Sequence, residues 1–139
     1  MQIEYRLLGA GDAGVFDSVA EEVFDEPVAP ARIAAYLAEP SHHMVVAIAG
    51  GQVVGQCAAV VHRHPDKVDE LYIDEVGVAP AWQRRGIARR MMEMMFSHGR
   101  AIGCGEAWVG TELDNDAANA LYEGFGAKAQ RFNLYEYEF

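Results

Sequence analysis

The sequence is poor in cysteine, in basic residues and in long apolar runs. Its 139 residues hold 2 cysteines, Cys57 and Cys104, and no Cys-x-x-Cys pair. A disulfide framework or a cysteine-based zinc site is therefore not indicated, and both cysteines are expected to be small core residues. The 5 histidines are scattered and match no zinc-ligand spacing, so no metal is expected.

Positive charge is also scarce, because 11 Lys and Arg stand against 21 Asp and Glu, for a formal net charge of −10. A chain this acidic is a poor nucleic-acid binder and favours a cationic small-molecule partner. The longest weakly charged stretch, 41–62, is broken by two histidines and a glycine turn, and the N-terminus has no basic segment followed by an apolar one. No membrane association is expected, and the chain is interpreted as cytoplasmic.

Length and composition predict one domain over residues 1–139, since 51% of the residues are hydrophobic and 23% charged. The mixed order of predicted strands and helices makes it an α/β domain. Alternating or β-branched apolar runs predict strands at 2–8, 44–49, 52–62, 68–78, 106–113 and 128–139, the last a strand or strand pair. Apolar residues at helical spacing predict helices at 12–24, 30–37, 86–102 and 116–125.

Two glycine motifs precede predicted helices. Residues 9–14 spell G-x-G-x-x-G, the pattern of dinucleotide-binding folds, but a parallel second strand should follow where residues 30–37 predict a helix. We interpret 9–14 as a turn with Asp12 as helix cap and keep nicotinamide binding as an alternative. The second motif, 83–88, joins the strand ending at Val78 to the methionine-rich helix, where free backbone N–H groups favour an anion.

Four arginines cluster around this second motif, although the chain as a whole is acidic. The cluster spans seven positions and consists of Arg84, Arg85, Arg89 and Arg90. It lies at the amino terminus of the predicted helix, where positive side chains oppose the helix dipole. This arrangement indicates an anionic partner such as a pyrophosphate. Gly86 lets the backbone approach that partner closely.

Residues 83–88 stand as Gln83-x-x-Gly86-x-Ala88, and residues 115–126 stand as N-x-x-A-x-x-L-Y-x-x-x-G. Both motifs resemble the GNAT superfamily of N-acetyltransferases. The resemblance implies the GNAT fold: a central mixed, mostly antiparallel sheet, splayed between its fourth and fifth strands and flanked by helices. It also implies acetyl-CoA as the cosubstrate. A non-catalytic acyl-CoA binding module is the alternative from another class.

The resemblance assigns roles to residues of this chain. The backbone of Val76, Gly77 and Val78 would pair with the pantetheine arm, and Asn115 would lie near the thiol end. Tyr122 would be the general acid that protonates the leaving thiolate, the alternative being a packing tyrosine. The pyrophosphate would be held by the loop residues Gln83, Arg84, Arg85, Gly86, Ile87 and Ala88.

Acidic residues indicate where the amine that accepts the acetyl group would bind. Asp74 and Glu75 interrupt an apolar strand, so they should face a polar cleft, where either is a candidate base with Glu75 preferred; the alternative is an ion pair with Arg84 or Arg85. Asp74 and Glu75, with Glu112 and Asp114, would line a cleft for a cationic amine.

The segment 70–78 is similar to GNAT-type aminoglycoside 3-N-acetyltransferases, which implies an aminoglycoside acceptor. A polyamine, an amino acid or a peptide amine remains the alternative acceptor. The chain could also form a homodimer, with the strand-like segment 135–139 in its interface.

Overall fold

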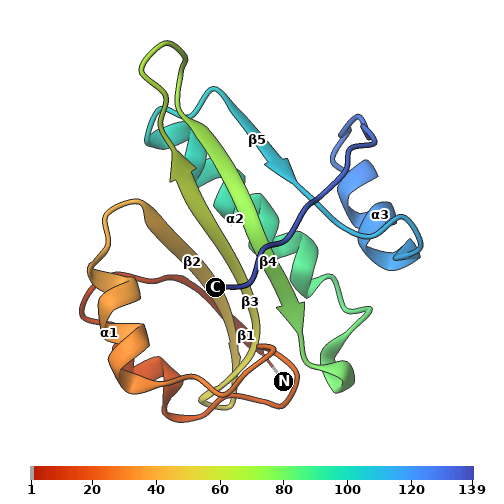
Figure 1. The fold of residues 1–139 in the computed structure, drawn as a ribbon. Helices are drawn as coiled ribbons and strands as arrows, with labels where there is room; N and C mark the ends of the chain where they lie inside the picture. The colour runs from red at the N-terminus through yellow and green to blue at the C-terminus, as the bar shows by residue number, and fades with distance from the viewer. Residues whose placement is uncertain (1) are drawn as a thin grey trace.

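The computed structural model describes residues 2–139 (Figure 1). One five-stranded sheet runs in the order β1-β2-β3-β4-β5. Its strands are β1 (Ile3–Leu7), β2 (His42–Ala49), β3 (Gln52–His62), β4 (Glu70–Val78) and β5 (Glu106–Val109). The helices are α1 (Pro30–Ala38), α2 (Ile87–Ala101) and α3 (Asp116–Glu123), with 3₁₀ turns η1 (Ala13–Asp17) and η2 (Pro80–Trp82). None of these helices has the length and apolar composition needed to cross a membrane.

Strands β1 to β4 pair antiparallel, and β5 joins β4 in parallel through the α2 crossover. The predicted hairpin between β2 and β3 is confirmed, with Gly50 and Gly51 both at positive φ in its turn. Pairing between β4 and β5 spans only Glu70–Ile73, whereas β4 continues to Val78. The sheet therefore opens between its fourth and fifth strands, as the sequence motifs implied.

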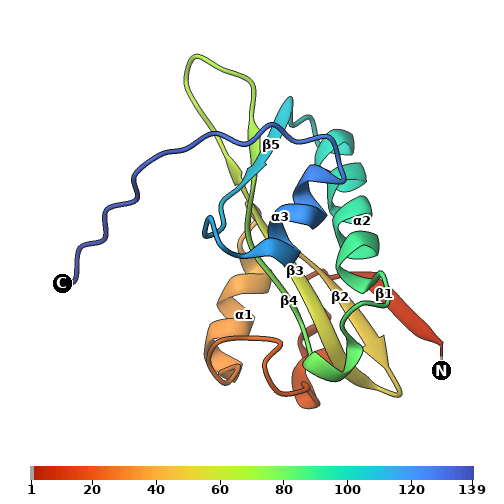
Figure 2. The same ribbon diagram turned by 90° about the vertical axis from the view of Figure 1, so that its right-hand side faces the viewer.

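Helix α1 covers one face of the sheet, and α2 and α3 cover the other (Figure 2). The larger core lies under α2, where Met91, Met92 and Met95 are buried against β2, β3 and β4. A smaller core on the α1 face holds Val23 and Met44. The methionine stripe expected from the sequence to pack in the core was Met91, Met94 and Met95. Met91 and Met95 are buried and Met94 is partly buried, so the packing role is confirmed.

Two predicted elements are wrong. Residues 12–24 form the short turn η1, a stretch at 18–20 that runs beside Val53, and then turns and bends. Ser18 and Ala20 hydrogen-bond to both backbone groups of Val53 instead of continuing a helix. Residues 128–139 form no strand within the described chain. The dinucleotide reading of residues 9–14 also fails, since β1 pairs antiparallel with β2 and not with a parallel strand.

Candidate active site

A β-bulge at Asp74 sets which side chains of β4 face each layer. Ala59 pairs with Ile73 and Ala58 with Glu75, so Asp74 is the extra residue. Before the bulge Ile73 packs in the α2 core, and after it Val76 takes that face. Simple alternation would put Glu75 on the α2 face with Ile73; the bulge turns it to the opposite face.

Where β4 continues beyond β5, a cavity of about 570 Å³ opens between β4, the η2–α2 loop and α3. Most residues predicted to hold the cofactor line it: Val76, Val78, Gln83, Arg84, Gly86, Ile87, Ala88 and Asn115. Tyr122 lines it as well. Segments up to 46 positions apart in sequence are therefore brought to one hollow, with Gly77 and Arg85 outside its lining.

Gly77 does not line the cavity but allows a close approach between two backbone segments. A side chain there would collide with the backbone carbonyl of Val23, so only glycine allows that chain segment to cross β4. On the edge of β4 that faces β5, no strand of the described chain pairs with the backbone beyond Ile73. This open edge is available to an amide-bearing arm, as predicted for 76–78.

The cavity ends at the amino terminus of α2, where the backbone geometry could hold an anion. Gly86 is the N-cap in the left-handed conformation (φ 78°), and no side chain caps the helix. Arg84 also has positive φ (62°), and Gln83 Nε2 donates to the carbonyl of Val78 at 3.1 Å, which fixes the loop against β4. The first N–H groups of α2 thus remain free for a phosphate.

The four clustered arginines are not equivalent. Arg85 lies over the ring of Trp82 at 4.8 Å, so the alternative of an Arg85 ion pair with Asp74 or Glu75 is not seen. Arg89 lies over the ring of Phe125, and both Arg89 and Arg90 contact Glu93. Arg84 and Arg89 line the cavity directly. Part of the positive cluster therefore serves packing within the fold.

Tyr122 on α3 is half-buried where the cofactor cavity meets a second cavity. Burial, helped by the nearby thiol of Cys57, raises the pKa of the Tyr122 hydroxyl above its usual value. The phenol is protonated at neutral pH, as an unperturbed tyrosine also is, and so has a proton to donate. Asn115 caps α3, its Oδ1 accepting from the backbone of Ala118 at 3.1 Å, and so fixes the helix that carries Tyr122.

The carboxylates of β4 lie in a partly dehydrated, acidic surrounding. Burial raises the pKa of Glu75, and the charges of Asp25 and Asp74 raise it further, while the Gln56 amide lowers it. Burial also raises the pKa of Asp74. A carboxyl group with a raised pKa is a better proton acceptor in its ionised form.

Sequence reasoning missed two contributors to this acidic group. Asp25 comes from the irregular segment after η1, one position beyond the helix expected at 12–24, and Gln56 lies in an apolar strand with 0% exposure. Gln56 Nε2 reaches the carbonyl of Val23 at 3.4 Å, and its Oε1 has no hydrogen-bond partner in the described chain. A lone glutamine within a buried strand was the available signal.

Glu112 and Asp114 lie in the exposed loop between β5 and α3. This loop is held by Asn119, whose side-chain amide donates to the backbone carbonyl of Glu112 at 3.1 Å. Neither carboxylate contributes to the raised pKa of Asp74 or Glu75. Their predicted contact with substrate stays a prediction.

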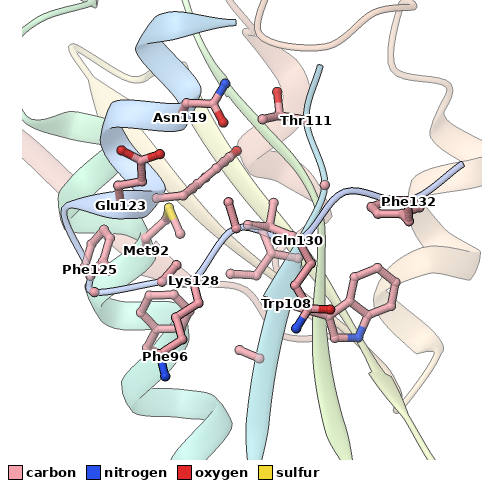
Figure 3. Close-up of a pocket in the computed structure, with 18 of the residues that line it drawn as sticks. Met92, Phe96, Trp108, Thr111, Asn119, Glu123, Phe125, Lys128, Gln130 and Phe132 are labelled. Carbon is pink, nitrogen blue, oxygen red and sulfur yellow. The ribbon is translucent and has the colours of Figure 1, made fainter. Parts of the chain in front are cut away.

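The second cavity, of about 700 Å³, lies between α2, β5, α3 and the chain after α3 (Figure 3). Its wall is mostly apolar, with Met92 and Phe96 from α2, Trp108 from β5 and Phe125 after α3. Tyr122 is shared by both cavities.

Three side chains with metal-ligand atoms meet at the far end of β4. Glu70 Oε2 lies 3.1 Å from His64 Nε2 and 3.8 Å from His62 Nδ1. Sequence reading did not join these residues, because the β3–β4 turn brings them together. A hydrogen bond joins His64 to Glu70, at the end of β4 opposite the α2 loop.

The fold is a five-stranded mixed sheet whose opening between β4 and β5 adjoins a cavity beside α2 and α3. The model of the acetyltransferase (GNAT) family matches residues 15–127, and the chain belongs to this family. The RimI N-alpha-acetyltransferase of Mycobacterium tuberculosis is 36% identical over 104 residues, which are 75% of this chain and 63% of that protein. The chain thus spans less than two thirds of that relative.

Solved structures confirm the GNAT fold. An aminoglycoside acetyltransferase from an uncultured soil metagenomic sample has a TM-score of 0.81 and 22% identity, with 100% of both chains covered. The aminoglycoside N-acetyltransferase AAC(6′)-Iy in complex with CoA has a TM-score of 0.78 and 16% identity, with 99% of this chain and 96% of that chain covered. At such identities the likeness establishes the fold alone.

Proposed function

We propose that the chain transfers an acetyl group from acetyl-CoA to a primary amine. The observation that carries this proposal is the cavity that opens where β4 continues beyond β5. Tyr122, the open edge of β4 and the uncapped amino end of α2 all border it. Membership of the GNAT family and the CoA bound to the similar fold of AAC(6′)-Iy support the same cosubstrate.

In this mechanism the amino end of α2 holds the pyrophosphate, and the free edge of β4 takes the pantetheine arm by backbone hydrogen bonds. A neutral amine attacks the thioester carbonyl directly, so a C–N bond forms and the C–S bond breaks. Glu75, directly or through water, takes the proton that the amine loses. Tyr122 protonates the departing thiolate of CoA.

The acceptor we propose is a polycationic amine, of which an aminoglycoside acetylated at its 3-amino group is the specific candidate. The carboxylates of Asp25, Asp74 and Glu75 and the net charge of −10 favour several positive charges at once. The similar aminoglycoside acetyltransferase folds are consistent with this acceptor.

A peptide α-amine is the second candidate, favoured by the 36% identity to RimI. Initial rates with kanamycin, gentamicin, spermidine and a peptide with N-terminal alanine, each at low and high salt, distinguish the two. The polycation should be preferred, and its apparent affinity should fall with salt because exposed charges are screened beyond about 8–10 Å. A peptide that is the best substrate, at a rate indifferent to salt, would refute the aminoglycoside assignment.

Acetyl-CoA binding without turnover on any of these amines would indicate the non-catalytic module instead. The position of the acetyl group on the product, determined by NMR, tests the 3-amino assignment separately.

A further inference from the structure

Four side chains with metal-ligand atoms converge beside the turn between β3 and β4. His62, Glu70 and Glu106 occupy matching positions on β3, β4 and β5, since Glu70 pairs in register with both of the others. His64 follows His62 by two positions, and its ring reaches the Glu70 carboxylate. This end of the sheet lies opposite the loop that leads into α2, so the group is separate from the cofactor cavity (Figure 1).

The distances within this group suit one small cation. Glu70 Oε2 lies 3.1 Å from His64 Nε2 and 3.8 Å from His62 Nδ1, and ligand atoms of the three residues all lie within 4.8 Å of one another. A tetrahedral zinc ion with bonds of about 2.0–2.1 Å holds its ligand atoms about 3.3 Å apart. Rotations of these side chains therefore suffice to reach coordination distance, and the strands need not move.

Glu106 brings a second carboxylate to the same place. The hydrogen bond to Glu70, together with the charge of Glu70, raises the pKa of the Glu106 carboxyl group above its usual value. Like charges at paired positions of a sheet repel each other. The charge of Lys67, in the β3–β4 turn, also acts on both carboxylates. A divalent cation between the two carboxylates would offset their repulsion more closely than an ammonium group on a flexible stem.

The hydrogen bond between His64 and Glu70 explains why those two side chains meet. It does not explain why His62 and Glu106 approach the same carboxylate from β3 and β5. A cation shared by all four side chains explains the whole arrangement.

We propose that this group is a zinc site that joins β3, β4 and β5 beside the β3–β4 turn. Its ligands are His62 Nδ1, His64 Nε2 and carboxylate oxygens of Glu70 and Glu106. Two imidazoles with two carboxylates suit zinc, whereas calcium and magnesium prefer ligand sets made of oxygen. The side chains of His64 and Glu70 are 18% and 16% exposed and that of His62 is 54% exposed, so the ion can enter from solvent.

The position of the site gives the metal a structural role. β5 is held to β4 by register pairs from Glu70–Glu106 to Ile73–Val109, and beyond them the two strands separate. A zinc ion at the first of these pairs would cross-link β5 to β4 and β3 where the ladder begins. Sequence spacing does not predict such a site, because its ligands come from three strands that only the fold brings together.

Calorimetric titration of the chelator-treated protein with zinc chloride tests the site. The wild-type protein should bind one Zn²⁺ per chain, and its melting temperature should rise as Zn²⁺ is added. His64→Gln and Glu70→Gln should each weaken Zn²⁺ binding by at least about tenfold, because each removes a ligand. Calcium chloride at the same concentrations should produce neither binding heat nor a shift in melting temperature.

Asp69→Asn is the matched control. It makes the same change of charge as Glu70→Gln one position earlier, where the carboxylate pairs with Arg63 at 2.8 Å instead. This variant should bind Zn²⁺ like the wild type. Melting curves recorded without metal show that each variant is folded.

Cobalt substitution supplies a second readout that needs no variant. Co²⁺ bound by two imidazoles and two carboxylates should give the visible absorption of a four-coordinate ion without a thiolate band in the near ultraviolet. A thiolate band would place the ion at a cysteine and overturn the proposal. A wild-type protein that binds no Zn²⁺, or an affinity that neither His64→Gln nor Glu70→Gln changes, would overturn it as well. These measurements use neither acetyl-CoA nor an acceptor amine, so they are independent of the proposed reaction.

Discussion

The rings of Tyr72 on β4 and Trp108 on β5 stack with centroids 4.1 Å apart and planes 18° apart. The two residues are register partners, one position before the last pair, Ile73 and Val109, at which the two strands still touch. The stack therefore holds the strands together next to the point where they separate to make the cofactor cavity. The packing where β4 and β5 are paired thus helps to position the part of β4 that continues beyond the pairing and lines the cavity.

Trp108→Ala should loosen this junction. Loss of the aromatic pair should cost about 0.5–1.5 kcal/mol of unfolding free energy beyond the lost apolar burial. The KM for acetyl-CoA should rise, since β5 no longer has a fixed position beside β4. Trp108→Phe keeps a ring and should restore most of both quantities. Urea unfolding measures the free energy of unfolding, and steady-state kinetics measure the KM. An unchanged KM in Trp108→Ala would show that the stack does not influence acetyl-CoA binding.

Gly86→Glu tests the anion site at the start of α2. A carboxylate there should repel the pyrophosphate and abolish the thermal shift that acetyl-CoA produces, which is worth about 2.7 kcal/mol at a hundredfold excess over the dissociation constant. Gly103→Glu is the matched control, because Gly103 also has positive φ (97°), also has open space around it and lies beyond the other end of α2. Both variants carry similar backbone strain, and only Gly86→Glu should lose binding.

Much of this site could be predicted because the cofactor loop is local in sequence. Residues 83–88 stand next to the helix they begin, so one motif specified the loop and the helix end together. The bulge at Asp74 could not be predicted, since it depends on the register between β3 and β4. Asp25 was missed for a related reason. The chain that leads to it is held by hydrogen bonds of Ser18 and Ala20 to the backbone of Val53, and such bonds leave no mark in side-chain periodicity.

The strand predicted at 128–139 shows why periodicity alone does not establish a strand. Apolar residues over 128–139 predicted a strand that the structure does not form, because a strand exists only with a partner, which periodicity does not identify. Helix α2, in contrast, satisfies its backbone internally. Its predicted range, 86–102, differs from the observed Ile87–Ala101 by one residue at each end.

Tyr122→Phe keeps the packing ring and removes the proton donor. Turnover should fall by about 10²–10⁴-fold with little change in acetyl-CoA affinity. Tyr5→Phe is a suitable control, because Tyr5 also packs against the α2 core but lies on β1, away from the splay. Stopped assays of thiol release give kcat, and calorimetry gives the affinity. Full activity in Tyr122→Phe would leave Tyr122 with a packing role only.

Glu75→Gln should stabilise the protein while it slows the reaction. The folded-state pKa of Glu75 is raised, so folding disfavours the ionised form and ionisation costs stability above that pKa. The variant should melt at a higher temperature than the wild type at pH 7. The difference should vanish as the pH falls below the carboxyl pKa of the unfolded chain. Glu112→Gln, in an exposed loop, should show no such pH-dependent gain.

Asp25→Asn should move the acid limb of the pH–rate profile. The Asp25 carboxylate helps to raise the pKa of Glu75, so its removal should lower that pKa. If Glu75 is the base, kcat/KM should then persist to lower pH than in the wild type, because Glu75 stays ionised further into the acid range. Glu26→Gln removes the same charge from the adjacent exposed position and should leave the limb in place. A limb that moves equally in both variants would reflect net charge alone, and one that moves in neither would separate Asp25 from the base.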